Sequence, residues 1–235
     1  MLSDRDSLPT VTQPDWSDVP DRLKRLTRAP FASAVLGSEL HHWKLESPLS
    51  LGELAELEAQ LQVELPEGYR SFLLQAGRGG AGPAYGLFPV RRIAGRWQWE
   101  GDGAELSDLG TLSRPFPHVT AFNPANSLPE PPTPGDYTSP EAYEAAESEY
   151  WEHHDAVAFS PEHSIGLLYL SHLGCALRHA LVITGPARGQ MWSDETADGN
   201  GYSPLHDLDG APLDFTHWYR HWLDTVAPRL TTPAR

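Results

Sequence analysis

Apolar residues recur at helical spacing between Pro66 and Gly77. The buried face of this predicted helix is formed by residues at i, i+3, i+4 and i+7, namely Tyr69, Phe72, Leu73 and Ala76. Pro66 suits the first turn because its missing N–H is no loss there. Gly77 can end the helix in the left-handed conformation. The glycine-rich stretch that follows, residues 78–82, predicts a turn from this helix into a strand.

A second helix is predicted just before the first. Ser50 and Glu53 form a capping-box pattern, and Leu49 and Leu54 are spaced as a hydrophobic staple. The expected buried stripe is Leu51, Leu54, Leu57 and Leu61, and the helix should end near Gln62. We expect these two helices to pack on one another, and residues 41–45 before them to form a strand.

Residues 16–28 predict an N-terminal amphipathic helix, with Val19, Leu23 and Leu26 at helical spacing among basic residues. This helix can be a peripheral element of the fold, the interpretation we favour, or a basic docking helix. Residues 1–15 and 229–235 are interpreted as tails that flank a single domain, residues 16–228.

Several apolar runs predict strands: residues 85–90, 93–100, 156–159, 165–170, 180–184 and 190–193. Side chains alternate along a strand, so Trp97 and Trp99 should share one face. A closing helix should begin after Asp214. It carries an aromatic stripe that we assign to the core: Phe215, Trp218, Tyr219, Trp222 and Leu223.

The middle of the chain has an unusual composition. Residues 123–140 are rich in proline and predict a loop, and a helix should start at Ser139 and end near His154. Together, residues 123–155 are interpreted as an acidic insertion. No Lys or Arg occurs between Arg114 and Arg178, although nine Asp and Glu residues do. This stretch is either a surface for a basic partner or a solvated segment without counter-charges.

The overall charge narrows the class of protein. The 235 residues carry a formal net charge of −15 at pH 7, which disfavours nucleic-acid binding and favours a basic partner. We expect no membrane span and a cytoplasmic location. Cys175 is the only cysteine, so no intrachain disulfide and no cysteine zinc site are possible.

Histidine offers the main alternative, a metal hydrolase. His217 and His221 stand at i and i+4, but Trp218 occupies the position where a zinc protease needs glutamate, and no third ligand is indicated. His153 is followed by His154 and Asp155, which point apart on a helix. Cys175 has no readable partners, and the loop at 78–82 lacks the Gly-Lys-Ser/Thr of a phosphate loop. We therefore predict that the protein is not an enzyme and that it binds neither a cofactor nor a metal ion.

Several blocks of the chain resemble one known family. These blocks are HWKLxxPL at 42–49, LPEGYRSFLL at 65–74, GxGGxGP at 77–83, GLFP at 86–89, LVITGPxxGQMWSD at 181–194 and FxxWYxxWL at 215–223. In order and number they are similar to the SMI/KNR-like family of the SUKH superfamily. The resemblance implies an α+β fold, with a mixed, largely antiparallel sheet and helices packed against it. It also implies a protein without catalytic residues or cofactor.

The resemblance further implies function through protein contact. Bacterial members are similar to immunity proteins that neutralise toxins of polymorphic toxin systems, and fungal members regulate cell-wall synthesis. We expect an immunity protein, a monomer that binds a basic toxin domain, with a regulatory scaffold as the alternative. Its predicted contact residues are Trp97, Trp99, Asp102 and Glu105, since aromatics rimmed by carboxylates suit an interface. The alternative is that both tryptophans are core.

Overall fold

The computed structural model describes residues 14–229, so the predicted tails lie almost wholly outside the described residues. The helices are α1 (Val19–Leu26), α2 (Ser38–His41), α3 (Leu51–Leu61), α4 (Glu67–Gln75), α5 (Pro140–Ala158) and α6 (Phe215–Arg229). The strands are β1 (Val90–Ile93), β2 (Arg96–Trp99), β3 (Leu167–Gly174), β4 (Leu177–Val182), β5 (Met191–Glu195) and β6 (Gly201–Pro204). Short 3₁₀ turns connect them.

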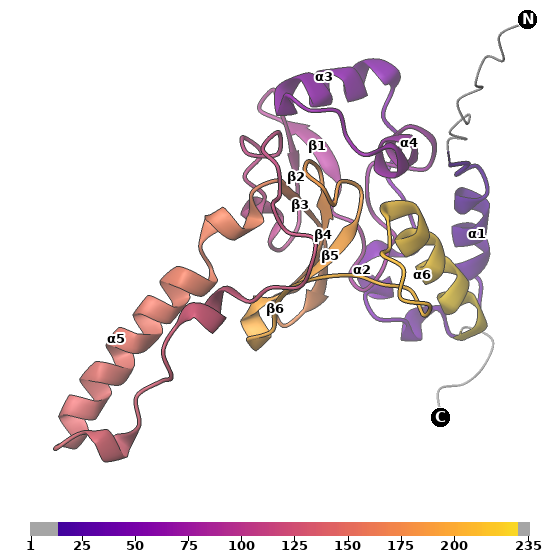
Figure 1. Cartoon of the computed structure of the whole chain (residues 1–235). Coiled ribbons are helices and arrows are strands. Elements are labelled where there is room, and N and C mark those ends of the chain that lie inside the picture. Colours follow the sequence, from indigo (N-terminus) through magenta and orange to yellow (C-terminus); the bar gives the residue numbers. More distant parts are fainter. Residues whose placement is uncertain (1–13, 230–235) are drawn as a thin grey trace, which may run out of the picture.

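The strands form two antiparallel sheets, which confirms the α+β class (Figure 1). β1 and β2 make a hairpin, and the larger sheet has the order β3-β4-β5-β6. In its register Arg178 lies opposite Asp194, and Asp194 lies opposite Tyr202. These three residues therefore stand side by side across three strands.

The two faces of the larger sheet have different coverings. On one face, His179 of β4 accepts a hydrogen bond from the indole Nε1 of Trp218 in α6, at 3.2 Å. On the other face, Trp192 of β5 meets Phe116 edge to face at 4.9 Å between ring centroids, and Phe122 stacks on Tyr202 at 5.0 Å. Helix α6 thus covers the first face, and the chain that leads towards α5 covers part of the second.

The predicted helix pair is confirmed, with two local differences. Ser50 and Glu53 form the full capping box, with Ser50 Oγ accepting from Glu53 N at 3.2 Å and Glu53 accepting from Ser50 N at 2.8 Å. Leu51 is 72% exposed, however, and does not join the buried stripe. Gly77 does not take the left-handed conformation. Glycine is required at position 77 for another reason: a Cβ there would lie 2.5 Å from the carbonyl oxygen of Glu46.

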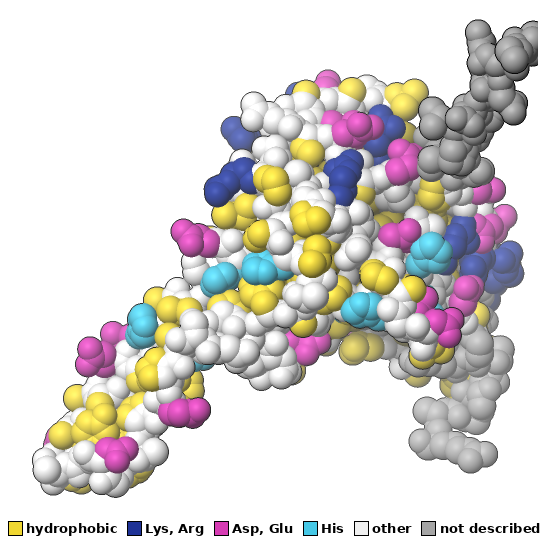
Figure 2. Space-filling view, in the orientation of Figure 1, with side chains coloured by type: hydrophobic (Ala, Val, Ile, Leu, Met, Phe, Trp, Pro, Cys, Tyr) yellow, Lys and Arg dark blue, Asp and Glu magenta, His cyan; other side chains and the backbone are white. Residues whose placement is uncertain are grey.

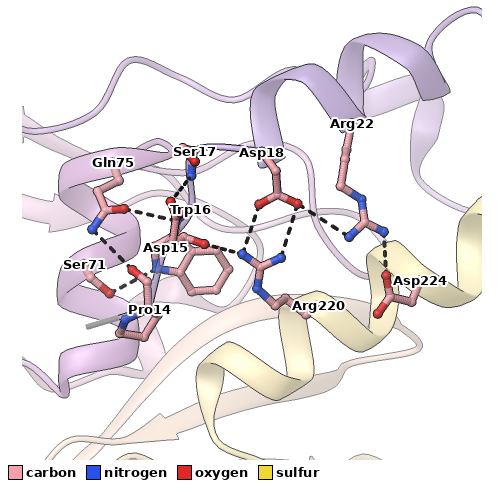
Figure 3. A network of polar contacts seen from close by, with 10 residues as sticks. All are labelled: Pro14, Asp15, Trp16, Ser17, Asp18, Arg22, Ser71, Gln75, Arg220 and Asp224. Atoms are coloured by element: carbon pink, nitrogen blue, oxygen red, sulfur yellow. Dashed lines mark hydrogen bonds and ion pairs between the residues drawn. The ribbon is translucent and has the colours of Figure 1, made fainter. Parts of the chain in front are cut away.

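Helix α1 is a peripheral element of the fold, held against α4 and α6 (Figure 3). Its apolar residues are buried, and Trp16, just before it, is fully buried. The Trp16 indole donates to Ser71 Oγ at 3.0 Å, and the Arg220 guanidinium lies 5.1 Å from the Trp16 ring. Arg220 also pairs with Asp18 at 3.0 Å. The contact of Trp16 with Arg220 and the Asp18–Arg220 ion pair therefore hold the start of the described chain against α6, about 200 residues later.

Three predicted strands were wrong. Residues 38–41 form α2, and within 41–45 only Leu45 makes a bridge, with Gly80. Residues 156–159 continue and end α5. Residues 85–88 follow the edge of β3, with Phe88 N donating to Leu170 O at 2.8 Å, but a regular strand begins only at Val90. Tertiary packing overrides strand propensity at 41–45, whereas residues 156–158 are helical because α5 continues through them.

Candidate protein-binding surface

The two tryptophans predicted as contact residues are buried. β2 alternates exposed and buried side chains, with Trp97 4% and Trp99 5% exposed. Gln60 of α3 bonds both backbone groups of Trp97, at 2.8 Å to N and 2.7 Å to O. The Trp99 indole donates to Tyr69 Oη at 2.8 Å. The shared face was therefore predicted rightly, but it packs on α3 and α4 and is not available as an anchor for a partner.

The two carboxylates of the same prediction are accessible. The Asp102 side chain is 70% exposed and lies 3.6 Å from Arg178 and 3.5 Å from His172 Nδ1. Glu105 lies in η2 (Ala104–Leu106) and is exposed. The structure thus separates the four predicted residues into two core aromatics and two surface acids.

Glu105 lines a cavity of about 400 Å³ on the face of the larger sheet opposite α6. All four strands contribute to its lining, through Tyr169, Arg178, Asp194 and Tyr202. Asp108 and the residues after α5, including Phe159, line it as well. Phe159 is 53% exposed. The cavity therefore combines aromatic walls with several carboxylates.

Asp194 is the most buried acid in this cavity, at 6% exposure. Its Oδ2 accepts from Tyr169 Oη at 2.6 Å, and its Oδ1 accepts from Thr196 N at 3.1 Å. Burial, together with the neighbouring Tyr202 and the charge of Asp194, holds the pKa of Tyr169 well above its usual range. Tyr169 therefore stays a neutral donor to the carboxylate at physiological pH.

Sequence reasoning did not find Asp194, Thr196, Tyr169 or Tyr202. The local signal is an acid near the end of a buried apolar strand, Asp194 in β5, followed two residues later by Thr196, whose N–H it accepts in an Asx turn. The convergence of Tyr169 and Tyr202 on this acid depends on the register of β3 to β6. No spacing along the chain shows that register.

The acidic insertion forms a projecting arm, which we define as residues 124–158. Figure 1 shows that the segment before α5 runs out from the body to the tip of the arm, and that α5 returns beside it towards the body. The helix starts at Ser139 as predicted, with the Ser139 side chain as its N-cap, but it runs to Ala158 and not only to His154. Ala158 is the one buried residue of this 19-residue helix. Nearly all of α5 is thus surface.

The arm is acidic and carries an exposed aromatic. Its acids are Glu130, Asp136, Glu141, Glu144, Glu147, Glu149, Glu152 and Asp155, and it contains no Lys or Arg. On the face seen in Figure 2, acidic and apolar side chains share the arm, whereas Lys and Arg side chains lie on the body. Trp151 is 46% exposed among these carboxylates.

The histidines of the alternative prediction do not converge. Within residues 14–229, no group of three or more His, Cys, Asp or Glu side chains is placed to hold a metal ion. His217 Nδ1 lies 2.9 Å from Asp214 Oδ1, at the start of α6, and His221 is exposed one turn later. His153 lies exposed on the arm, and Cys175 is exposed at the turn between β3 and β4.

The glycine-rich loop has a structural role. Gly80 bridges both Leu45 and Leu87, so its backbone lies between two other segments. Its φ is +110°, and a Cβ would lie 2.4 Å from the carbonyl oxygen of Lys44. Among the described helices, none is long and apolar enough to cross a membrane.

The fold and surface define a class of protein: an α+β domain with two antiparallel sheets, a layer of helices and an acidic projecting arm. The SMI1 / KNR4 family (SUKH-1) model matches residues 48–174, and the chain belongs to this family. The match spans α3, α4, β1, β2, the arm and β3. No curated protein and no solved structure matches the chain.

Proposed function

We propose that this chain is a non-catalytic immunity protein that binds and neutralises a basic toxin domain. Membership of the SMI1 / KNR4 family supports a role in protein binding, and the net charge of −15 supports a basic partner. The observation that carries the proposal is the arm: eight carboxylates without a single Lys or Arg on an element that projects from the body.

The arm is suited to attract and then hold a basic surface. Like charges on one element produce a field that speeds the encounter with an oppositely charged partner. Trp151 supplies an exposed aromatic within that field, and tryptophan is prominent among residues that dominate binding energy. Carboxylates around an aromatic anchor give complementarity to a cationic surface.

The test measures binding of this protein to the toxin domain encoded by the adjacent gene. The toxin domain is used as a catalytically inactive variant. We expect a one-to-one complex in calorimetry, weakening as salt rises, and protection of cells that express the active toxin. A neighbouring gene without a toxin domain, or a toxin domain that does not bind, would contradict the immunity role. The first of these results would favour the regulatory scaffold.

Variants of the arm sharpen this test. Glu144→Gln with Glu152→Gln removes two exposed charges from the arm, and we expect at least a tenfold loss of affinity. The matched control is Glu39→Gln with Asp209→Asn, which removes the same charge from exposed sites on the body. Equal losses in both pairs would show that net charge, and not the arm, determines binding. Trp151→Ala should weaken binding without lowering the unfolding temperature.

A further inference from the structure

The cavity beside the root of the arm contains a buried carboxylate without a cationic partner. Asp194 is 6% exposed, and among the described residues it forms no ion pair with any Lys or Arg. Each carboxylate oxygen accepts one hydrogen bond, from Tyr169 or from the backbone of Thr196. Because each carboxylate oxygen has two acceptor positions, the carboxylate can accept a further bond beside its contact with the Tyr202 side chain.

A second polar group in the cavity also lacks a partner. Thr196 lines the cavity and is 7% exposed; its hydroxyl forms no hydrogen bond of normal geometry among the described residues, and the Tyr202 side chain is its polar neighbour. Buried hydroxyls are normally hydrogen-bonded, so an unused one marks a position where a ligand donor or acceptor can bind. Thr196 and Asp194 are two residues apart, on the same wall.

Arg178, the one cation among the described residues that line the cavity, is directed elsewhere. Arg178 Nη1 donates to Ala176 O at 2.8 Å, and its Nη2 lies 3.6 Å from Asp102 Oδ1. Asp102 therefore balances Arg178, whereas Asp194 and the lining acids Glu105 and Asp108 form no ion pair within residues 14–229. The uncompensated negative charge of these carboxylates favours a cationic ligand in the cavity.

We infer that this cavity receives an arginine side chain of the basic partner, with its guanidinium on Asp194 and Thr196. The inference rests on the proposed function for the source of that arginine. A planar guanidinium pairs with a carboxylate and stacks on aromatic faces, and Tyr169, Tyr202 and Phe159 form such walls. A volume of about 400 Å³ accommodates one side chain together with water.

The position of the cavity fits a partner that lies along α5. Trp151, Asp155 and Phe159 follow one another at intervals of four residues, which places them along one side of the helix. Phe159 ends this row and also lines the cavity. A basic segment bound along the arm would therefore reach the cavity at the end of α5.

The probe is N-acetyl-arginine methylamide, titrated into the ¹⁵N-labelled protein and followed by NMR. We expect saturable shifts at the amides of Ala176, Thr196 and Ala197. The citrulline analogue, which has the same shape and no charge, should bind at least tenfold more weakly. Shifts that are absent from these amides, or equal for both compounds, would overturn the inference.

Three variants complete the experiment. Asp194→Asn should weaken probe binding at least tenfold, and Glu105→Gln, at an exposed site that tolerates change, about threefold. Asp198→Asn is the matched control, because it removes the same charge from an exposed residue of η6 (Thr196–Asp198) that does not line the cavity; it should change binding less than twofold. Glu105→Gln gives the answer even if Asp194→Asn does not fold.

The result of the arginine-probe titration can be distinguished from the result of the toxin-binding assay. A toxin domain that binds while the probe does not would remove the cavity from the interface and leave the immunity role intact. A probe that binds in the cavity while no toxin domain binds would support the site and contradict the proposed function.

Discussion

The hydrogen bond between Trp99 and Tyr69 gives a direct measure of whether the β2 tryptophans act in the core. Tyr69 is 2% exposed and Trp99 5%, and the indole N–H donates to Tyr69 Oη at 2.8 Å. Tyr69→Phe keeps the aromatic ring, which lies 4.9 Å from that of Phe215, and removes only the acceptor. The buried N–H then has no partner, which costs about 1–3 kcal/mol of unfolding free energy.

The assay is urea unfolding followed by circular dichroism. With a slope of about 2 kcal/mol per molar urea, a loss of about 2 kcal/mol lowers the midpoint by about 1 M. Trp99→Phe and the double variant close a mutant cycle, in which we expect a coupling of about 1 kcal/mol. Tyr137→Phe, on the arm, is the control and should change stability by less than about 0.5 kcal/mol. If Tyr69→Phe lowered the unfolding free energy as little as the Tyr137→Phe control does, the reasoning would be refuted.

Three further predictions concern stability. Ser50→Ala removes the capping box and should cost about 1 kcal/mol in urea unfolding. His41 is buried, and burial lowers its pKa to about 4. The unfolded chain therefore binds more protons below pH 6.5, and His41 should contribute about 2 kcal/mol to the loss of stability between pH 7 and pH 5, a contribution that His41→Asn should remove; the buried His179, whose pKa is also lowered to about 4, should contribute a similar loss that this variant leaves in place. Gly80→Ala should prevent folding, as judged by circular dichroism, whereas Gly52→Ala, in an open part of α3, should stabilise by about 0.5–1 kcal/mol.

Local rules in the sequence were sufficient for the helices of the core. The spacing in α4 and α6 predicted which side chains are buried, and Ser50, Ser139 and Asp214 were predicted to mark the starts of their helices. Each of these signals acts within about four residues, so its outcome depends little on the rest of the chain. The same holds for the acidic composition of the arm, although not for its projection.

Strand prediction failed where apolar residues are buried by other means. Trp43 lies outside any strand and stacks on Trp222 of α6 at 5.9 Å, and residues 156–158 are helical because α5 continues through them. Short apolar runs do not distinguish a strand from the end of a helix. Leu51 shows the reverse case, an apolar residue at helical spacing that no other element covers.

The sequence by itself determined the family, the helix pair, the acidic stretch without Lys or Arg, and the shared face of Trp97 and Trp99. Only the tertiary structure decided which way that face points, and that Asp194, Tyr169 and Tyr202 meet in one cavity. The physical reason is distance along the chain. Alternation in a strand specifies which side chains go together, whereas burial and sheet register depend on contacts with segments far away in sequence.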